Sequence, residues 1–167
     1  MKKAPPNGTR NERELKTNIQ HNVTVDQPIE KVWAVLSDPW QLAPCLPGAE
    51  ITEAVSDTEF NGRVKVKLGP LSMSIKGKII IEELDAGAYK IRMRGKGNDV
   101  LGAGNASLTI RGQLTSLGES STALATDAEV EINGRMAQFA SRLIHGVSET
   151  MFKKFLANLQ QKLAETG

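Results

Sequence analysis

The chain has 167 residues, of which 40% are hydrophobic and 24% are charged, as expected for one soluble globular domain. A formal net charge of +2 is too small for a nucleic-acid-binding surface, and a single cysteine excludes an intramolecular disulfide. No stretch approaches the roughly 18 consecutive apolar residues of a membrane-spanning helix, and no apolar signal segment follows Met1, so the expected location is the cytoplasm.

The chain begins with a polar segment that gives way to a strand pattern. Residues 1–16 are rich in charge and proline, which predicts a flexible leader. Apolar and polar residues then alternate up to Val25, as in a strand with one buried face. A helix is predicted next, with Asp26 as its cap and Pro28 in its first turn. A second short helical turn ends at Leu46–Gly48, which directs the chain into extended structure.

Strand patterns dominate from about residue 49 to residue 132. Residues 60–68 and 71–81 alternate apolar with polar side chains and are joined by Gly69–Pro70, which predicts a long antiparallel hairpin. Glycines recur inside the strands and permit the bends and bulges of a strongly curved sheet. These glycines are Gly62, Gly77, Gly95, Gly97, Gly102, Gly104 and Gly112.

One face of the hairpin and of the strand after it is basic. It is expected to be a solvated surface that discourages edge pairing, or else a docking face for an acidic partner or anionic lipid. Its cations are Arg63, Lys65, Lys67, Lys76, Lys78, Lys90, Arg92 and Arg94.

The last segment has helical periodicity. From Arg135 onward, apolar residues fall at three- and four-residue steps, which predicts one helix of about 28 residues after a turn at Asn133–Gly134. The element order is therefore one strand, two short helices, a run of about six strands and one long helix. This order predicts an α+β helix-grip fold over residues 17–163, with a curved antiparallel sheet of about seven strands around the C-terminal helix. A short tail is expected at residues 164–167.

The interior of this fold is expected to contain an apolar cavity. Only 4% of the residues are aromatic, so few bulky rings are available to fill the concave side of the sheet. An unfilled apolar cavity suits a hydrophobic ligand. The residues expected to line it are Leu46, Pro47, Gly48, Val64, Val66, Met73, Ile75, Met93, Leu101, Met136, Phe139, Ala140, Leu143 and Val147.

The sequence offers no catalytic or metal-binding constellation. His21 and His145 lie on different predicted elements, and a metal site needs three or more converging ligands. Cys45 lies between a proline and a leucine with no base nearby, so a buried inert thiol is expected. The glycine-rich segment 95–104 lacks the ending of a phosphate-binding loop and is expected to be a flexible hairpin loop or bulge at the cavity mouth.

Four segments of the chain carry motifs in a specific order. They are Val32–Pro39 (VWAVLSDP), Leu42–Ala49 (LAPCLPGA), Asn61–Pro70 (NGRVKVKLGP) and Asp127–Phe139 (DAEVEINGRMAQF). Together they resemble the CoxG family of carbon monoxide dehydrogenase subunits, and the resemblance covers residues 17 to about 163. The chain departs from the family pattern at Asn133, where valine is usual, and at Phe139, where glycine is frequent.

The resemblance implies a START-like accessory protein of the SRPBCC (Bet v 1-like) superfamily that is not itself an enzyme and holds no covalent cofactor. The partners it implies are a quinone or other apolar small molecule, a molybdenum-flavin dehydrogenase complex, and peripheral contact at the inner face of the membrane. Two alternatives stay open at this point. One is a polyketide cyclase- or dehydratase-like enzyme, which would need converging acid and base residues, and the other is an assembly factor without a ligand.

Overall fold

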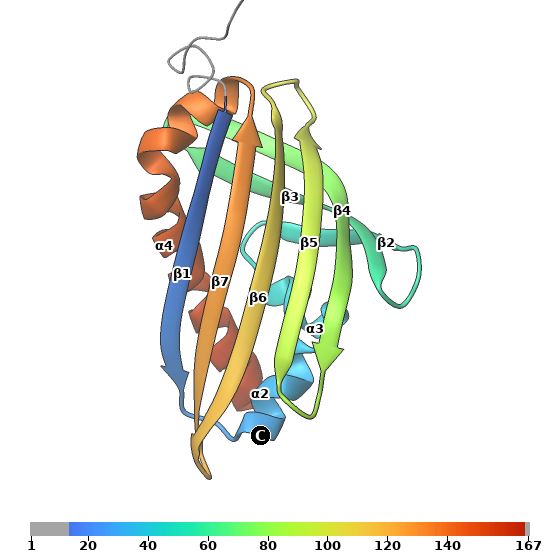
Figure 1. Cartoon of the computed structure of the whole chain (residues 1–167), viewed down its shortest axis with the longest axis vertical. Helices are drawn as coiled ribbons and strands as arrows, with labels where there is room; N and C mark the ends of the chain where they lie inside the picture. The colour runs from blue at the N-terminus through green and yellow to red at the C-terminus, as the bar shows by residue number, and fades with distance from the viewer. Residues whose placement is uncertain (1–13, 166–167) are drawn as a thin grey trace, which may run out of the picture.

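Seven strands form one antiparallel sheet that curves around a long helix (Figure 1). The computed structural model describes residues 14–165 of the chain. The strand order is β1-β7-β6-β5-β4-β3-β2, so the edge strands β1 and β2 follow each other in the sequence and are joined by the short helices. The strands are β1 (Glu14–Val25), β2 (Ala49–Ala54), β3 (Glu59–Leu68), β4 (Leu71–Asp85), β5 (Lys90–Asp99), β6 (Asn105–Gly118) and β7 (Ser121–Asn133). The helices are α2 (Ile29–Leu36), α3 (Pro39–Leu42), the 3-10 turn η1 (Ala43–Cys45) and α4 (Arg135–Glu165).

The sheet bends where glycines of three neighbouring strands lie side by side. Gly62 on β3 pairs with Gly77 on β4, which pairs with Gly97 on β5. A methyl group on Gly77 would overlap the Lys96 carbonyl oxygen, so no larger residue fits there without a backbone shift. Figure 1 shows β3 and β4 curving from this region toward the upper end of α4. That these glycines cause the curvature stays a prediction. Gly102 and Gly104, which were predicted to lie inside a strand, are in the loop between β5 and β6.

Two apolar clusters, one toward each end of α4, hold this helix against the rest of the fold. The α2 cluster joins the C-terminal half of α4 to α2 and to β6 and β7, and includes Val32, Leu114, Leu124, Phe155 and Leu159. The hairpin cluster joins the first turns of α4 to the β3–β4 hairpin and β7, and includes Leu68, Met73, Ile132, Met136 and Ala140. Each fully buried leucine or methionine contributes about 2 kcal/mol to the stability of the fold.

The predicted helix-grip fold is confirmed, with differences at the start of the chain. β1 begins at Glu14, so residues 14–16 belong to the sheet and not to the leader, because Leu15 packs against the hairpin cluster. The rest of the predicted leader, residues 1–13, lies outside the described residues. The predicted cap by Asp26 is wrong. Pro28 is the N-cap of α2, and no side-chain hydrogen bond caps that helix.

The last helix follows the predicted position closely. Gly134, with a φ of 91°, turns the chain immediately before α4, which then runs for 31 residues. It therefore takes in residues 164 and 165, which were predicted as tail. Despite this length, α4 is not apolar enough to cross a membrane, and neither is any other helix in the described part of the chain.

Candidate functional site

The contact between His21 and α4 shows which face of the sheet points inward. The Nε2 atom of His21 lies 3.0 Å from the Ser148 hydroxyl oxygen, and its ring stacks on Phe152 with centroids 4.2 Å apart. The odd-numbered residues of β1 therefore face α4, since side chains alternate along a strand. Residues that pair across neighbouring strands lie on the same face of the sheet. By this pairing, Ile110 on β6 and Ile79 on β4 also lie on the inner face.

Six apolar side chains form a band across the middle of this inner face, which we call the inner band. Paired strand positions bring them together from β1, β4, β5 and β6, and none is part of the α2 cluster or the hairpin cluster. None is fully buried, and Ile79 remains 37% exposed although it lies on the concave side. The inner band consists of Ile19, Ile79, Ile81, Met93, Leu108 and Ile110.

Two features leave the inner band incompletely covered. Among the strands, α4 packs chiefly on β1, β3 and β7, and it meets the central strands β4 and β6 within the two clusters toward its ends. Small residues also occupy inner positions beside the band, because Gly95 lies between Ile79 and Leu108 while Ala128 pairs with Ile110. The middle of the concave face thus presents apolar surface that the chain's own side chains do not bury, as a binding site for an apolar molecule requires.

The residues predicted to line a cavity fall into three groups in the structure. Val64, Pro47, Val66, Ile75, Met93, Phe139, Leu143 and Val147 are half-buried. Met73, Met136 and Ala140 are fully buried members of the hairpin cluster. Leu46, Gly48 and Leu101 are exposed, and Leu101 is 84% exposed on the loop between β5 and β6. Contact of these residues with a ligand stays a prediction.

Sequence reasoning missed most of the inner band. Met93 was among the predicted lining residues, but Ile79, Ile81, Leu108 and Ile110 were not. Leu108 and Ile110 alternate with polar residues, whereas Ile79 and Ile81 flank a third isoleucine, and the pairing of the strands shows that all four share one band. Strand register, which links residues far apart in the chain, was the missing information.

Asp99 fixes the loop between β5 and β6. The predicted flexible loop at 95–104 was too long, because residues 95–99 belong to β5. Its carboxylate accepts hydrogen bonds from the backbone N–H groups of Ser74, Leu101 and Ala103, at 3.0–3.1 Å. These bonds, that of Ala103 above all, hold the pKa of Asp99 below its ordinary value against the opposing effect of desolvation, and Arg135 lowers it further. Sequence analysis gave Asp99 no role, and the buried carboxylate shows that the loop is held by a specific network.

Both histidines lie at one groove, although they are far apart in the sequence. An open groove of about 540 Å³ runs between the edge of β1 and α4, and its lining includes His21, His145, Gly146 and Glu149. Within the described residues 14–165, no cluster of three or more histidine, cysteine or acidic side chains could hold a metal ion. His21 is already engaged by Ser148 and Phe152, which indicates a role in joining β1 to α4.

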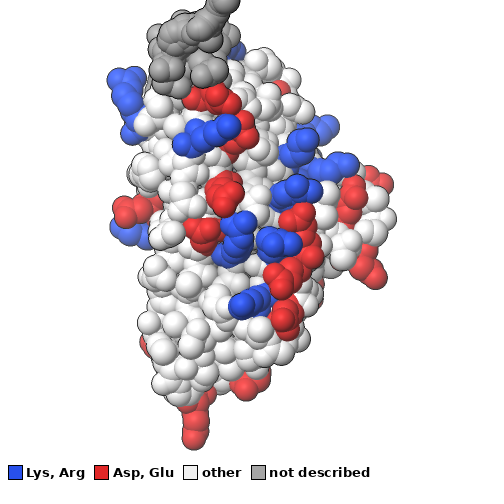
Figure 2. Space-filling view, viewed as in Figure 1, with Lys and Arg blue, Asp and Glu red and all other residues white. Residues whose placement is uncertain are grey.

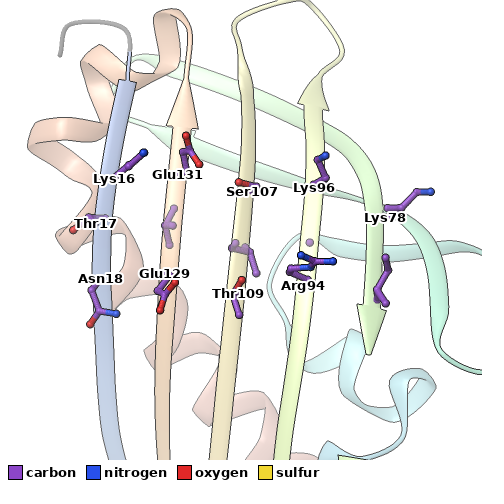
Figure 3. A pocket seen from close by; sticks show the side chains of 14 residues that line it. Lys16, Thr17, Asn18, Lys78, Arg94, Lys96, Ser107, Thr109, Glu129 and Glu131 are labelled. Carbon is purple, nitrogen blue, oxygen red and sulfur yellow. The ribbon is translucent and has the colours of Figure 1, made fainter. Parts of the chain in front are cut away.

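The outer face of the sheet carries an open trough of about 780 Å³. Figure 3 shows the hydroxyl-bearing residues Ser107 and Thr109 on β6 between Glu129 and Glu131 on one side and Arg94 and Lys96 on the other. Figure 2 shows that basic and acidic side chains are interspersed over this face.

Carboxylates neutralise much of the face that was predicted to be basic. Arg94 pairs with Glu82 at 3.0 Å, and Arg63 pairs with Glu50 at the same distance. Lys78 likewise pairs with Glu59 at 3.1 Å. Exposed pairs of this kind contribute little to stability, typically about 0.2–1 kcal/mol. The mixture of charges agrees with a solvated surface.

Cys45 is buried at the end of η1. Burial raises the pKa of its thiol, and Lys162 opposes this shift only in part. The thiolate, which is the nucleophilic form, is therefore disfavoured. The backbone carbonyl of Cys45 accepts a hydrogen bond from the Asn158 side chain at 3.0 Å, which links η1 to α4.

Solved structures of other proteins share this fold. A conserved protein from Geobacillus kaustophilus superposes with a TM-score of 0.80 at 20% identity, covering 91% of this chain and 97% of that chain. The Zhui aromatase/cyclase from Streptomyces sp. R1128 has a TM-score of 0.64 at 17% identity, over 90% and 94% of the two chains. Norcoclaurine synthase from Thalictrum flavum has a TM-score of 0.62 at 15% identity, over 99% and 96%. Identities this low indicate a common fold and carry no function across.

Sequence comparison identifies the protein family, which the structural matches do not. No curated protein sequence matches it significantly. The CoxG family of carbon monoxide dehydrogenase subunits, in contrast, matches residues 22–164, which is nearly the whole described structure. The matched range contains α2, six of the seven strands in full and almost all of α4. The chain therefore belongs to the carbon monoxide dehydrogenase CoxG family.

Proposed function

We propose that the protein binds an apolar small molecule, a quinone or another lipid, between α4 and the inner band. The supporting observation is that the inner band belongs to neither core cluster and keeps apolar surface accessible on the concave side of the sheet. A bound ligand would remove this surface from water, at about 25 cal/mol per Å² of apolar area.

The chemistry of the inner band favours binding over catalysis. All six of its side chains are aliphatic or thioether groups, without an ionisable atom. A cyclase or dehydratase would need acid and base groups that converge on its substrate. Methionine and the branched aliphatic residues instead adapt to irregular apolar shapes. The protein's role is therefore to hold its ligand without altering it.

Family membership supports a second part of the proposal. We infer that the protein acts as an accessory subunit to a molybdenum-flavin dehydrogenase of the carbon monoxide dehydrogenase type, and that it brings that enzyme and the ligand together at the membrane. Measured binding to the purified dehydrogenase of the same organism, with and without vesicles of that organism's lipids, tests this part. Absence of binding in both conditions would refute it.

A pair of tryptophan substitutions on β6 tests the ligand site. Ile110 faces inward within the inner band, and its neighbour Thr109 lines the outer trough. Equilibrium dialysis would use a decyl-substituted benzoquinone and palmitate as two probes. Ile110→Trp should weaken binding of whichever probe the unmodified protein binds, by about tenfold or more, because the indole occupies the ligand's space. Thr109→Trp should leave affinity within about twofold of the unmodified protein.

The same measurement can refute the proposal. Failure of the unmodified protein to bind either probe would exclude a ligand site for these classes of molecule. Equal loss in both variants, with folding confirmed by circular dichroism, would place the site somewhere other than the inner band.

A further inference from the structure

Trp40 is an exposed aromatic residue that contacts the inner face of the sheet. It lies on α3 and is 57% exposed, although its ring packs edge-on against Phe60 with centroids 6.3 Å apart and planes at 87°. Phe60 is buried on β3, on the same inner face as Ile79 with which it pairs. Several large apolar side chains are exposed in the described residues, and Trp40 is distinguished among them by its contact with a buried ring on the inner face.

Apolar side chains continue from Trp40 to the centre of the inner band. Phe60 contacts the Trp40 ring and lies beside Ile79, which is 37% exposed. The Cδ1 atom of Ile79 reaches over Gly95, within 2.8 Å of the position that a Cβ atom would take there. Beyond Gly95 the next inner residue is Leu108. The Ile79 side chain occupies the space that Gly95 leaves, so the apolar surface is continuous from Trp40 to Leu108.

The backbone beneath Trp40 is held firmly while its ring is not. The Asp38 carboxylate accepts hydrogen bonds from the Trp40 backbone N–H at 3.0 Å and from the Gln41 side chain at 3.1 Å. Asn158 of α4 bonds to the carbonyl of Cys45, just past α3, at 3.0 Å. The indole ring meets Phe60 through an apolar edge-to-face contact, which rotation about the side-chain torsions can break and remake.

We propose that Trp40 is the gate through which an apolar ligand reaches the inner band. A gate at Trp40 presupposes the ligand site proposed above, and it adds the route by which the ligand enters that site. The ring swings away from Phe60 to admit the ligand and returns to cover Ile79 once the ligand is bound. An uncharged molecule with a flat ring or a single alkyl chain suits this path, because an aromatic or aliphatic group can take the place of Phe60 against the Trp40 ring while it passes.

The kinetics of probe binding distinguish a gate from a residue that merely lines the site. The decyl-substituted benzoquinone serves as the probe, in stopped-flow and dialysis measurements on the full chain. Trp40→Ala should raise both association and dissociation rates about fivefold and leave Kd within about twofold, since a gate alters the barrier and not the bound state. Trp40→Phe should restore rates close to those of the unmodified protein. Leu117→Ala, at a residue that is 56% exposed near the end of β6, is the matched control and should change neither rate.

A single-tryptophan protein gives a second readout. With Trp33→Phe as background, Trp40 is the sole tryptophan, because the chain contains two. Its emission should be quenched when the benzoquinone binds, and its quenching by acrylamide in solution should fall when palmitate binds.

The outcomes separate the gate from the ligand site. Probe binding that is lost in Ile110→Trp, together with unchanged rates in Trp40→Ala and unchanged Trp40 emission, would overturn the gate while upholding the ligand site. A Kd that rises tenfold in Trp40→Ala without faster exchange would make Trp40 a wall of the site and would also overturn the gate. No binding of either probe to the unmodified protein would overturn both proposals.

Discussion

His21 on β1 and Ser148 on α4 lie 3.0 Å apart, from the ring Nε2 atom to the hydroxyl oxygen, and so join the edge of the sheet to the long helix. Both residues are half-buried, and the His21 ring also stacks on Phe152. This link lies between the two apolar clusters along α4.

Ser148→Ala should lower the free energy of unfolding by about 1 kcal/mol, because it leaves a partly buried imidazole nitrogen without its hydroxyl partner. Urea denaturation monitored by tryptophan fluorescence measures this change. Thr150→Ala, at an exposed position of the same helix, is the control and should differ from the unmodified protein by less than about 0.5 kcal/mol. Equal stability of the two variants would show that the His21–Ser148 contact is not formed in solution.

Asp99→Asn should loosen the loop between β5 and β6 and lower Tm by several degrees at neutral pH. The folded protein holds the pKa of Asp99 below its ordinary value, so the ionised carboxylate stabilises the fold above the pKa of the unfolded chain. This contribution disappears as the pH falls through the depressed folded-state pKa. The difference in Tm between the unmodified protein and Asp99→Asn should therefore shrink steadily below about pH 4.

Asp57→Asn provides the comparison for that titration, since Asp57 is exposed in the β2–β3 turn. It should shift Tm little at any pH. A Tm difference for Asp99→Asn that grew on acidification would contradict the role assigned to the ionised carboxylate.

Gly77→Ala should be strongly destabilising, by about 3 kcal/mol or more, because the added methyl group overlaps the backbone of β5. Gly112→Ala is the matched substitution on the same inner face, where no atom lies within 4 Å of the new Cβ. It should be neutral, or stabilising by about 0.5 kcal/mol through reduced freedom of the unfolded chain. Chemical denaturation of both proteins tests the contrast, and similar stabilities would mean that the sheet does not bend at Gly77 as described.

Cys45 should react very slowly with a thiol reagent such as dithionitrobenzoate in the folded protein. Burial raises the pKa of its thiol and also blocks access to it. The rate should rise by several orders of magnitude in denaturant, and should follow the unfolded fraction at intermediate concentrations. Rapid reaction under native conditions would show that η1 separates readily from α4.

The local pattern of the sequence was enough to predict the order of elements. Alternation on either side of Gly69–Pro70 predicted the β3–β4 hairpin, and the three- and four-residue steps from Arg135 predicted α4. Both depend on neighbours in the chain, for which periodicity is a direct signal. The family motifs were equally local, and the family assignment is confirmed.

Contacts between residues far apart in the chain could not be predicted in the same way. Met136 and Ala140 were predicted from helical periodicity to face inward, and only the folded structure shows that they are fully buried in the hairpin cluster. Ile79 and Leu108 were overlooked, although strand register places them on either side of Gly95. Periodicity identifies the inward side of an element but not how far the opposite element lies, and that distance decides whether an apolar residue is core or surface.

The glycines that bend the sheet and the residues of the inner band differ in how freely they can change. Gly62 and Gly77 meet backbone atoms where any side chain would sit, so these sites have almost no permitted alternatives. The six residues of the inner band face accessible space and can vary in length and branching at small structural cost. Substitutions at Ile79, Met93 or Ile110 can therefore reshape the concave face and leave the glycine bend of the sheet unchanged.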